Sequence, residues 1–211
     1  MNIIYGGGYN KLSEESIKAS FINTYYPYIK RFKENVKKVA FVTLAKSDGY
    51  YDKLIFPLYS NLVDVIGFSN LKNVVWTSYD ALFLFGGNAT SLLNGLKESK
   101  FDLDGLKKDA IVLGDSAGSY VLSSYFYDSP LGDLRGLQIE FVEGLNSKAK
   151  VITIAHKNNP TYCNDTLIEK VNNFAREKSI NVLFLEENEQ KLLKDGDFVD
   201  FNKEHLFQVN Q

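Results

Sequence analysis

Short runs of consecutive apolar residues recur along the chain, separated by longer stretches in which apolar and polar residues are mixed. The runs cover residues 39–44, 63–68, 81–85, 110–113, 151–155 and 182–185. Near-continuous apolar runs of this length are typical of strands that are covered on both faces, as in parallel sheets. The pattern therefore predicts a buried strand over each run.

The stretches between the runs show the spacing of amphipathic helices. Apolar residues recur at helical spacing in 166–178, and 12–32 begins with a serine and two glutamates that suit a helix N-terminus. Residues 92–96 and 120–126 are shorter helix-like stretches, and 198–209 is typical of a terminal hairpin. Strands that alternate with helices predict an α/β domain with a mainly parallel sheet.

The segment 128–150 departs from this alternation. It contains Pro130, several glycines and a short strand-like stretch over 137–142. We expect an antiparallel excursion or an active-site flap there. The chain has 211 residues, 45% of them apolar, and it contains no repeat or linker, so we expect a single domain over 1–211.

Composition narrows the classes of partner and compartment. The net charge is −2 and the lysines are scattered, so we expect no nucleic-acid partner. The single cysteine, Cys163, excludes an intramolecular disulfide and favours a reducing compartment. The N-terminus lacks a signal-peptide pattern, and no apolar run approaches the roughly 20 residues that span a bilayer. We therefore expect a soluble, cytoplasmic protein without a membrane partner.

The sharpest functional signal is the pentapeptide Gly114-Asp115-Ser116-Ala117-Gly118, which follows an apolar run and precedes a helix-like stretch. This is a G-x-S-x-G nucleophile elbow in the strand-to-helix context that it requires. So tight a turn needs small flanking residues, and it places the serine at a helix N-terminus, where developing negative charge is favoured. Ser116 is the candidate nucleophile, and the alternative is an ordinary glycine-rich turn with a capping serine.

A second glycine motif, Phe85-Gly86-Gly87-Asn88-Ala89-Thr90, also lies between a strand and a helix-like stretch. A glycine pair lets backbone N–H groups approach a ligand closely, so this turn could form half of an oxyanion hole. A plain turn with an Asn or Thr cap explains the motif equally well. Both interpretations stay open at this point.

A serine nucleophile needs a base, and the chain has two histidines. His156 ends the apolar run 151–155, at the edge of the sheet where α/β active sites gather. His205 lies in a charged tail, where a solvated surface histidine is expected. Given Ser116, His156 is the better candidate base.

The base in turn needs an orienting acid. Glu186 and Glu187 follow the run 182–185, so they are expected at the same edge as the histidine. One of these carboxylates would accept the proton of the far ring nitrogen and fix the tautomer. We favour Glu187, with Asp128 as a further candidate, whereas the alternative is an acidic cap on a hydrophilic loop.

The two glycine motifs, followed by a later histidine and glutamate, are similar in order and spacing to the dipeptidase E / cyanophycinase family of serine peptidases. The resemblance covers roughly residues 39–190, and the two glycine motifs are its most specific part. It implies a three-layer α/β sandwich with the topology of class I glutamine amidotransferases. It implies no metal and no organic cofactor, and it implies small peptides as substrates, while a monomer or a homodimer would both fit.

The resemblance also implies a role for each candidate residue. Ser116 would be the nucleophile, His156 the general base and acid, and Glu187 the orienting carboxylate. The backbone N–H groups of Gly87 and Ala117 would form the oxyanion hole.

The chain departs from the family after the histidine. Dipeptidase E has an arginine-bearing segment there that recognises an N-terminal aspartate, whereas His156 is followed by Lys157-Asn158-Asn159-Pro160-Thr161-Tyr162-Cys163. The nearby Arg176 lies inside a predicted helix, so the resemblance supports the fold and the nucleophile more strongly than specificity for aspartyl dipeptides, and the side-chain specificity stays open. We expect Asn88 and Asp115 at the substrate-binding site, where the charge of Asp115 would repel acidic substrates or face solvent.

Two other interpretations stay open. In the α/β-hydrolase order of serine, acid and histidine, His205 would be the base and Asp195, Asp197 or Asp200 the acid. An amidotransferase-like domain can also lose its chemistry and act as a binding module. Cys163 follows neither a strand nor a glycine elbow, so we do not expect it to be a nucleophile.

Overall fold

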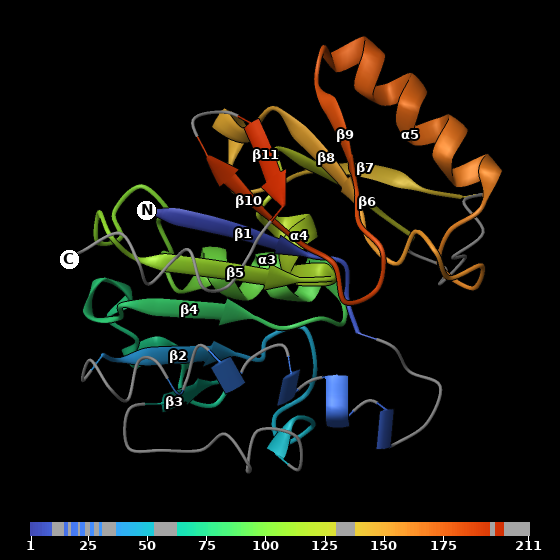
Figure 1. The fold of residues 1–211 in the computed structure, drawn as a ribbon. Helices are drawn as coiled ribbons and strands as arrows, with labels where there is room; N and C mark the ends of the chain where they lie inside the picture. Colours follow the sequence, from blue (N-terminus) through green and yellow to red (C-terminus); the bar gives the residue numbers. More distant parts are fainter. Residues whose placement is uncertain are drawn as a thin grey trace.

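The computed structural model describes residues 1–9, 37–52, 63–129, 138–194 and 197–200, together with scattered positions between 15 and 30. Its strands and helices form a mixed α/β fold with two sheets (Figure 1). The sequence predicted one mainly parallel sheet, whereas the structure divides the strands between two sheets. Most of the predicted helix over 12–32 and the part of the predicted hairpin beyond 200 lie outside the described residues.

Seven described strands form the larger sheet. They are β1 (Asn2–Gly6), β2 (Val39–Val42), β3 (Val63–Ile66), β4 (Ala81–Leu84), β5 (Ile111–Asp115), β10 (Gln190–Lys194) and β11 (Asp197–Asp200). Their order is β11-β10-β1-β5-β4-β2-β3. Five neighbouring strands of this sheet, in the order β1-β5-β4-β2-β3, are parallel to one another. The hairpin of β10 and β11 pairs antiparallel with β1 at one edge.

Four described strands form the smaller sheet. They are β6 (Tyr125–Asp128), β7 (Glu140–Glu143), β8 (Val151–Ile154) and β9 (Asn181–Phe184). Their order is β7-β6-β8-β9, and β7 alone is antiparallel to its neighbour. The strands that precede His156 and Glu187 therefore belong to a different sheet from the strand that precedes Ser116.

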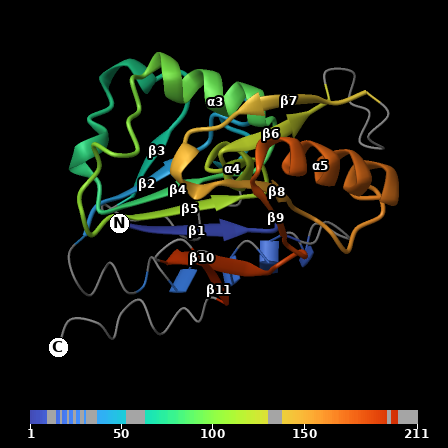
Figure 2. The same cartoon turned by 90° about the horizontal axis from the view of Figure 1, so that it is seen from above.

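The helices described over their whole length are α3 (Ala89–Glu98), α4 (Ala117–Val121) and α5 (Asp165–Lys178), with short 3₁₀ segments at Leu71–Asn73, Trp76–Ser78 and Ser147–Ala149. Asparagine side chains accept hydrogen bonds from the first turns of α3 and α5, which satisfies backbone donors that a helix start leaves free. Helix α5 packs on β8 and β9 (Figure 2), whereas α4 contacts strands of both sheets. Helix α4 therefore links the two sheets at the candidate elbow.

The parallel strands are covered on both faces, as their continuous apolar composition predicts. In β2, Ala40 and Val42 belong to one buried cluster, whereas Val39 and Phe41 belong to another. None of these four side chains is exposed to solvent. Because successive side chains of a strand point to opposite faces, the alternation shows that both faces of the sheet are buried.

The strands predicted over the apolar runs are confirmed, but the helix predicted over 120–126 is wrong. Helix α4 ends at Val121, and strand β6 begins at Tyr125 and pairs with β7. Phe126 is fully buried, whereas Tyr125 is half-buried, and aromatic residues that alternate in this way favour a strand over a helix. The β6–β7 hairpin is the antiparallel excursion expected in 128–150.

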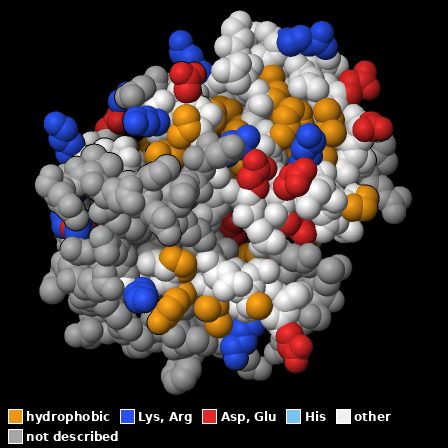
Figure 3. Space-filling model, in the orientation of Figure 1, with side chains coloured by type: hydrophobic (Ala, Val, Ile, Leu, Met, Phe, Trp, Pro, Cys, Tyr) orange, Lys and Arg blue, Asp and Glu red, His pale blue; other side chains and the backbone are white. Residues whose placement is uncertain are grey.

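The surface carries charges of both signs. On the face shown in Figure 3, basic and acidic side chains lie interspersed, in keeping with the net charge of −2. Among the described residues, no helix has the length and apolar character that a membrane crossing requires.

Candidate active site

Ser116 lies in a sharp turn between β5 and α4. Its backbone has φ 52° and ψ −108°, a conformation that costs a residue other than glycine about 1–3 kcal/mol. A Cβ on Gly114 would lie 2.4 Å from the carbonyl group of Gly118, and a Cβ on Gly118 would lie 2.1 Å from the carbonyl oxygen of Leu84. The small residues beside the serine are therefore required by close backbone contacts, as the elbow motif predicts.

The Gly86-Gly87 turn follows β4 and lies beside the elbow. A Cβ on Gly86 would lie 3.2 Å from the Cβ of Ser116. Gly87 has φ 139°, and a Cβ there would lie 2.3 Å from the carbonyl oxygen of Ala45, so only glycine fits this position. Within the described part of the chain, the N–H groups of Gly87 and Ala117 donate to no protein acceptor, so both are available to a ligand.

Ser116, His156 and Glu187 form a continuous hydrogen-bonded chain. The Oγ of Ser116 lies 3.1 Å from Nε2 of His156, and Nδ1 of the same ring lies 2.9 Å from Oε1 of Glu187. The three residues follow the carboxyl ends of β5, β8 and β9, so the chain crosses from the larger sheet to the smaller one. The His156 and Glu187 side chains are 4% and 8% exposed, so water screens their interaction only weakly.

Two asparagines hold Glu187. Nδ2 of Asn159 donates to the same Oε1 at 2.8 Å, and the backbone N–H of Glu187 donates to Oδ1 of Asn158 at 2.9 Å. An ionised carboxylate can only accept, so Nδ1 of His156 carries the ring proton and Nε2 presents its lone pair to Ser116. This tautomer is the one that can take the proton of the serine hydroxyl.

The segment Gly6-Gly7-Gly8, at the end of β1, connects the loops that carry these three residues. Its successive carbonyl groups accept the backbone N–H groups of Ser116 at 3.0 Å, His156 at 2.9 Å and Asn188 at 2.6 Å. Asn188 directly follows the candidate acid. One short segment therefore sets the relative positions of the nucleophile, the base and the acid loop.

The glycine segment also leaves no room for side chains. A Cβ on Gly7 would lie 1.9 Å from the carbonyl oxygen of Glu186, and a Cβ on Gly8, which has φ 90°, would lie 2.1 Å from Cε1 of His156. The imidazole is in addition stacked on the ring of Tyr162, with a centroid distance of 4.7 Å and an interplanar angle of 29°. The position of the ring is thus fixed by steric contact as well as by hydrogen bonds.

The two side chains expected at the substrate-binding site have structural partners instead. Asp115 is 3% exposed, and its Oδ1 accepts the backbone N–H of Gly8 at 3.0 Å, so this carboxylate does not face solvent. Oδ1 of Asn88 accepts the N–H of Ser91 at 2.7 Å and caps helix α3. Both side chains hold the backbone around the site.

The other acid candidates and the cysteine lie apart from the imidazole contacts. Glu186 is exposed, and Oδ2 of Asp128 accepts the hydroxyl of Thr90 at 2.5 Å. Cys163 is buried, and burial raises the pKa of its thiol, which disfavours the reactive thiolate. Of the acids that the sequence offered, Glu187 is the one bonded to His156.

The alternative base falls elsewhere in the chain. His205 and Asp195 lie outside the described residues, whereas Asp197 and Asp200 bound β11 at the outer edge of the larger sheet. His156 already occupies the hydrogen-bonding position at the serine hydroxyl.

A small pocket opens at Ser116 and His156, and it has only about 10 Å³ of space for the centre of a water-sized molecule. Tyrosines and a lysine from the loops after β1 and β2 line it together with the glycines of the β4 turn. The lining residues are Gly8, Tyr9, Lys46, Tyr50, Tyr51, Gly86, Gly87, Ser116 and His156. Ser116, His156 and the Gly86-Gly87 turn therefore line one pocket.

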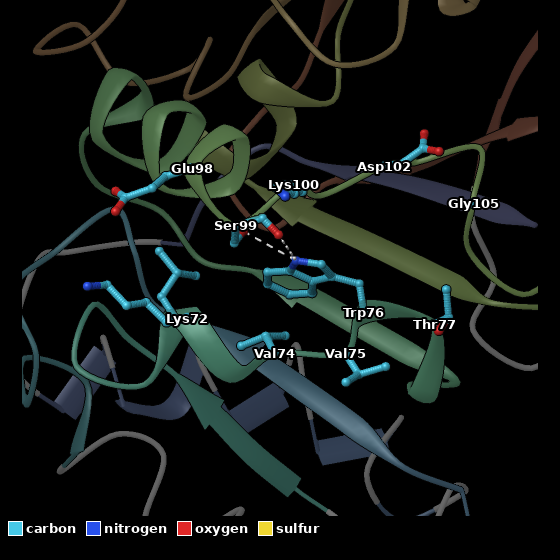
Figure 4. A pocket seen from close by; sticks show the side chains of 11 residues that line it. Lys72, Val74, Val75, Trp76, Thr77, Glu98, Ser99, Lys100, Asp102 and Gly105 are labelled. Carbon is cyan, nitrogen blue, oxygen red and sulfur yellow. Dashed lines mark hydrogen bonds between the residues drawn. The ribbon is translucent and has the colours of Figure 1, made fainter.

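A larger hollow is lined by residues that precede β4 and β5 in the chain and by the end of α3, and it shares no lining residue with the pocket at Ser116 (Figure 4). Trp76 forms its floor and donates through Nε1 to the backbone oxygen and the hydroxyl of Ser99, at 3.3 Å and 3.2 Å. Lys72, Glu98 and Lys100 lie around it. Among its described lining residues, no hydroxyl is hydrogen-bonded to an imidazole, so Ser116 and His156 remain the candidate site.

The sequence did not lead us to the glycine segment 6–8, to Asn159 or to Tyr162. The glycine triplet does carry a signal, because it directly follows the apolar stretch Ile3-Ile4-Tyr5 and so resembles a strand end that a ligand or backbone approaches closely. Asn159 and Tyr162 lie in a polar loop that has no comparable pattern.

Neither a metal centre nor a known relative adds to this description. In the part of the chain that the structure describes, no group of three or more His, Cys, Asp or Glu side chains is arranged to hold a metal ion. The chain matches no protein-family model, and a search of curated proteins finds no significant match.

Proposed function

We propose that the protein is a serine hydrolase with Ser116 as nucleophile, His156 as general base and acid, and Glu187 as orienting carboxylate. The observation that carries the proposal is the hydrogen-bonded chain through the imidazole, with distances of 3.1 Å and 2.9 Å. The same order of hydroxyl, imidazole and carboxylate activates serine on several unrelated folds. The strained elbow supports it, because such backbone conformations cluster at functional sites.

The reaction proceeds through an acyl-enzyme. Oγ of Ser116 attacks the carbonyl carbon while Nε2 of His156 takes the hydroxyl proton, and the oxyanion develops against the N–H groups of Gly87 and Ala117. His156 then gives its proton to the leaving group, and water hydrolyses the ester in the same way. Throughout, Glu187 stabilises the imidazolium.

Small peptides are the substrates that we propose, on the resemblance to the dipeptidase E / cyanophycinase family. The two glycine motifs of this chain that carry the resemblance follow β4 and β5, which are neighbouring parallel strands. The same resemblance supports a finer fold proposal, the class I glutamine amidotransferase-like sandwich. The mixed α/β fold with a mainly parallel larger sheet is compatible with it.

The test is covalent labelling with a fluorophosphonate probe, with the modified residue located by mass spectrometry. Phosphonylation forms a bond between Oγ of Ser116 and phosphorus, expels fluoride and passes the hydroxyl proton to His156. We expect labelling at Ser116 in the wild type and in His205→Ala, and loss of labelling in Ser116→Ala and His156→Ala. A panel of dipeptides with varied side chains then tests the peptidase proposal.

The other outcomes separate the alternatives. Loss of labelling in His205→Ala but not in His156→Ala would favour the α/β-hydrolase order. A folded wild type that is not labelled and cleaves no dipeptide would favour a binding module without catalysis.

A further inference from the structure

Tyr51 lies beside the Gly86-Gly87 turn and has no role in the reaction scheme so far. It is 2% exposed, and its hydroxyl donates to the carbonyl oxygen of Gly86 at 2.5 Å. Its ring is fixed by an edge contact with Phe85, with a centroid distance of 4.9 Å. The hydroxyl is thus delivered to one carbonyl group by a packed, buried side chain.

The carbonyl of Gly86 and the N–H of Gly87 belong to the same peptide group. The described chain contains no cis peptide bond, so this carbonyl and this N–H point in opposite directions. When Tyr51 holds the carbonyl, it also fixes the direction of the N–H. The next amide is held as well, because the N–H of Asn88 donates to the carbonyl of Ala45 at 2.8 Å.

We propose that Tyr51 is a positioning residue for the oxyanion hole, which it orients by holding the Gly86-Gly87 peptide group from its carbonyl side. The inference rests on the proposed function, because it assigns the Gly87 N–H to the oxyanion. A glycine pair is conformationally permissive, so without such a contact the peptide group could rotate and remove the donor from the site. A hydrogen bond to the carbonyl also polarises the amide and strengthens its N–H as a donor.

The surroundings of Tyr51 keep its hydroxyl a donor. Burial, with the nearby Tyr9 and Asp115, raises the pKa of Tyr51 far above its ordinary value, so the hydroxyl stays protonated. The hydroxyls of Tyr9 and Tyr51 are hydrogen-bonded to each other. Because Tyr51 has one proton and donates it to Gly86, Tyr9 is the donor in that pair.

The experiment measures how fast the fluorophosphonate probe labels Ser116 in Tyr51→Phe, as a function of probe concentration. We expect the limiting labelling rate at saturating probe to fall about 10- to 100-fold, less than the 10²–10³-fold for loss of an oxyanion donor, because the donor remains but is no longer fixed. The probe concentration at half-maximal rate should stay within about twofold, since ground-state binding does not use the hole. A residue that only supports the fold would not separate these two quantities.

Tyr79→Phe is the matched control. Tyr79 is also buried, and its hydroxyl donates to Asp64 at 2.8 Å at the far side of the larger sheet. We expect its labelling kinetics to equal those of the wild type. Tyr9→Phe is a second variant, and it leaves Tyr51 in place. We expect its limiting labelling rate to fall, but by less than in Tyr51→Phe.

The outcomes are distinguishable from those of the proposed function. A wild type without labelling at Ser116 would contradict the proposed function itself. A labelled wild type, with limiting rates in Tyr51→Phe and Tyr9→Phe within about twofold of it, would overturn the role of Tyr51 alone. If Tyr51→Phe does not fold, the Tyr9→Phe rate decides, and an unchanged rate there overturns the inference.

Discussion

At the scale of single residues, the candidate nucleophile and base share an uncommon backbone. Ser116 has φ 52° and His156 has φ 54°, both in a region that residues other than glycine rarely adopt. Each is held there by a hydrogen bond from its own N–H to the glycine segment after β1. Backbone strain at two residues whose side chains are hydrogen-bonded to each other is typical of functional sites, and it is what a candidate active site would show.

The choice between the neighbouring acids can be tested at this scale. In Glu187→Gln, a neutral amide no longer stabilises the imidazolium, and we expect the limiting rate of Ser116 labelling to fall about 10²–10⁴-fold. Glu186→Gln is the matched control, because Glu186 is the adjacent and exposed carboxylate. Its labelling should equal that of the wild type. Equal effects of the two substitutions would remove Glu187 from the triad.

At the scale of elements, the sequence predicted what local pattern determines. Continuous apolar runs gave the parallel strands, and the glycine motifs predicted the two turns that meet at Ser116. The helix over 120–126 was wrong because strand pairing with β7 outweighs the local spacing. Strand β1 was missed because its apolar run, Ile3-Ile4-Tyr5, is short and is followed by glycines, although the strand lies inside the larger sheet, between β5 and β10.

The missed parts of the site share a physical cause. Asn159, in the loop after β8, donates a hydrogen bond to Glu187, in the loop after β9. Tyr51, in the loop after β2, donates to the carbonyl oxygen of Gly86, in the turn after β4. Such contacts depend on the three-dimensional arrangement of distant segments, and no periodicity or spacing in the sequence encodes them. Ser116, His156 and Glu187 could be chosen because each lies within a few residues of the end of a predicted strand.

The glycine segment makes an element-scale prediction. In Gly8→Ala, the new Cβ would overlap the imidazole of His156, so we expect loss of most Ser116 labelling. Gly49→Ala is the matched control, because Gly49 also has positive φ, of 82°, but its Cβ would lie 3.5 Å from the Asp52 side chain. Both substitutions should cost about 1 kcal/mol of unfolding free energy for the backbone conformation, measured by urea denaturation. Normal labelling in Gly8→Ala would show that the imidazole is not confined as described.

At the scale of the whole molecule, the candidate site depends on the position of one sheet relative to the other. The candidate nucleophile follows a strand of the larger sheet, whereas the candidate base and acid follow strands of the smaller one. Helix α4 contacts both, and the N–H of Ser124, just after α4, donates to the carbonyl of Val151 in β8 at 2.9 Å. The candidate site therefore lies at the carboxyl edge of the larger sheet, and the opposite, amino edge is remote from Ser116.

Asp80 lies at that amino edge and gives a pH-dependent prediction. Partial burial by itself raises the pKa of its carboxyl group, but hydrogen bonds from the Lys107 side chain and the Lys38 backbone, both at 2.8 Å, lower it below 3.8 overall. A lowered pKa means that the ionised carboxylate stabilises the fold above pH 3.8, and that this stabilisation is lost as the pH falls through the lowered value. We expect Asp80→Asn to reduce the free energy of unfolding by about 1–2 kcal/mol at pH 7, with the difference from wild type shrinking towards pH 3, while Ser116 labelling at pH 7 is unchanged. Asp104→Asn is the control, because the Asp104 and Lys148 side chains are 66% and 74% exposed and such a pair contributes under about 1 kcal/mol. A difference for Asp80→Asn that stays constant between pH 7 and pH 3 would show that packing, rather than the charge, is what this residue contributes to the whole molecule.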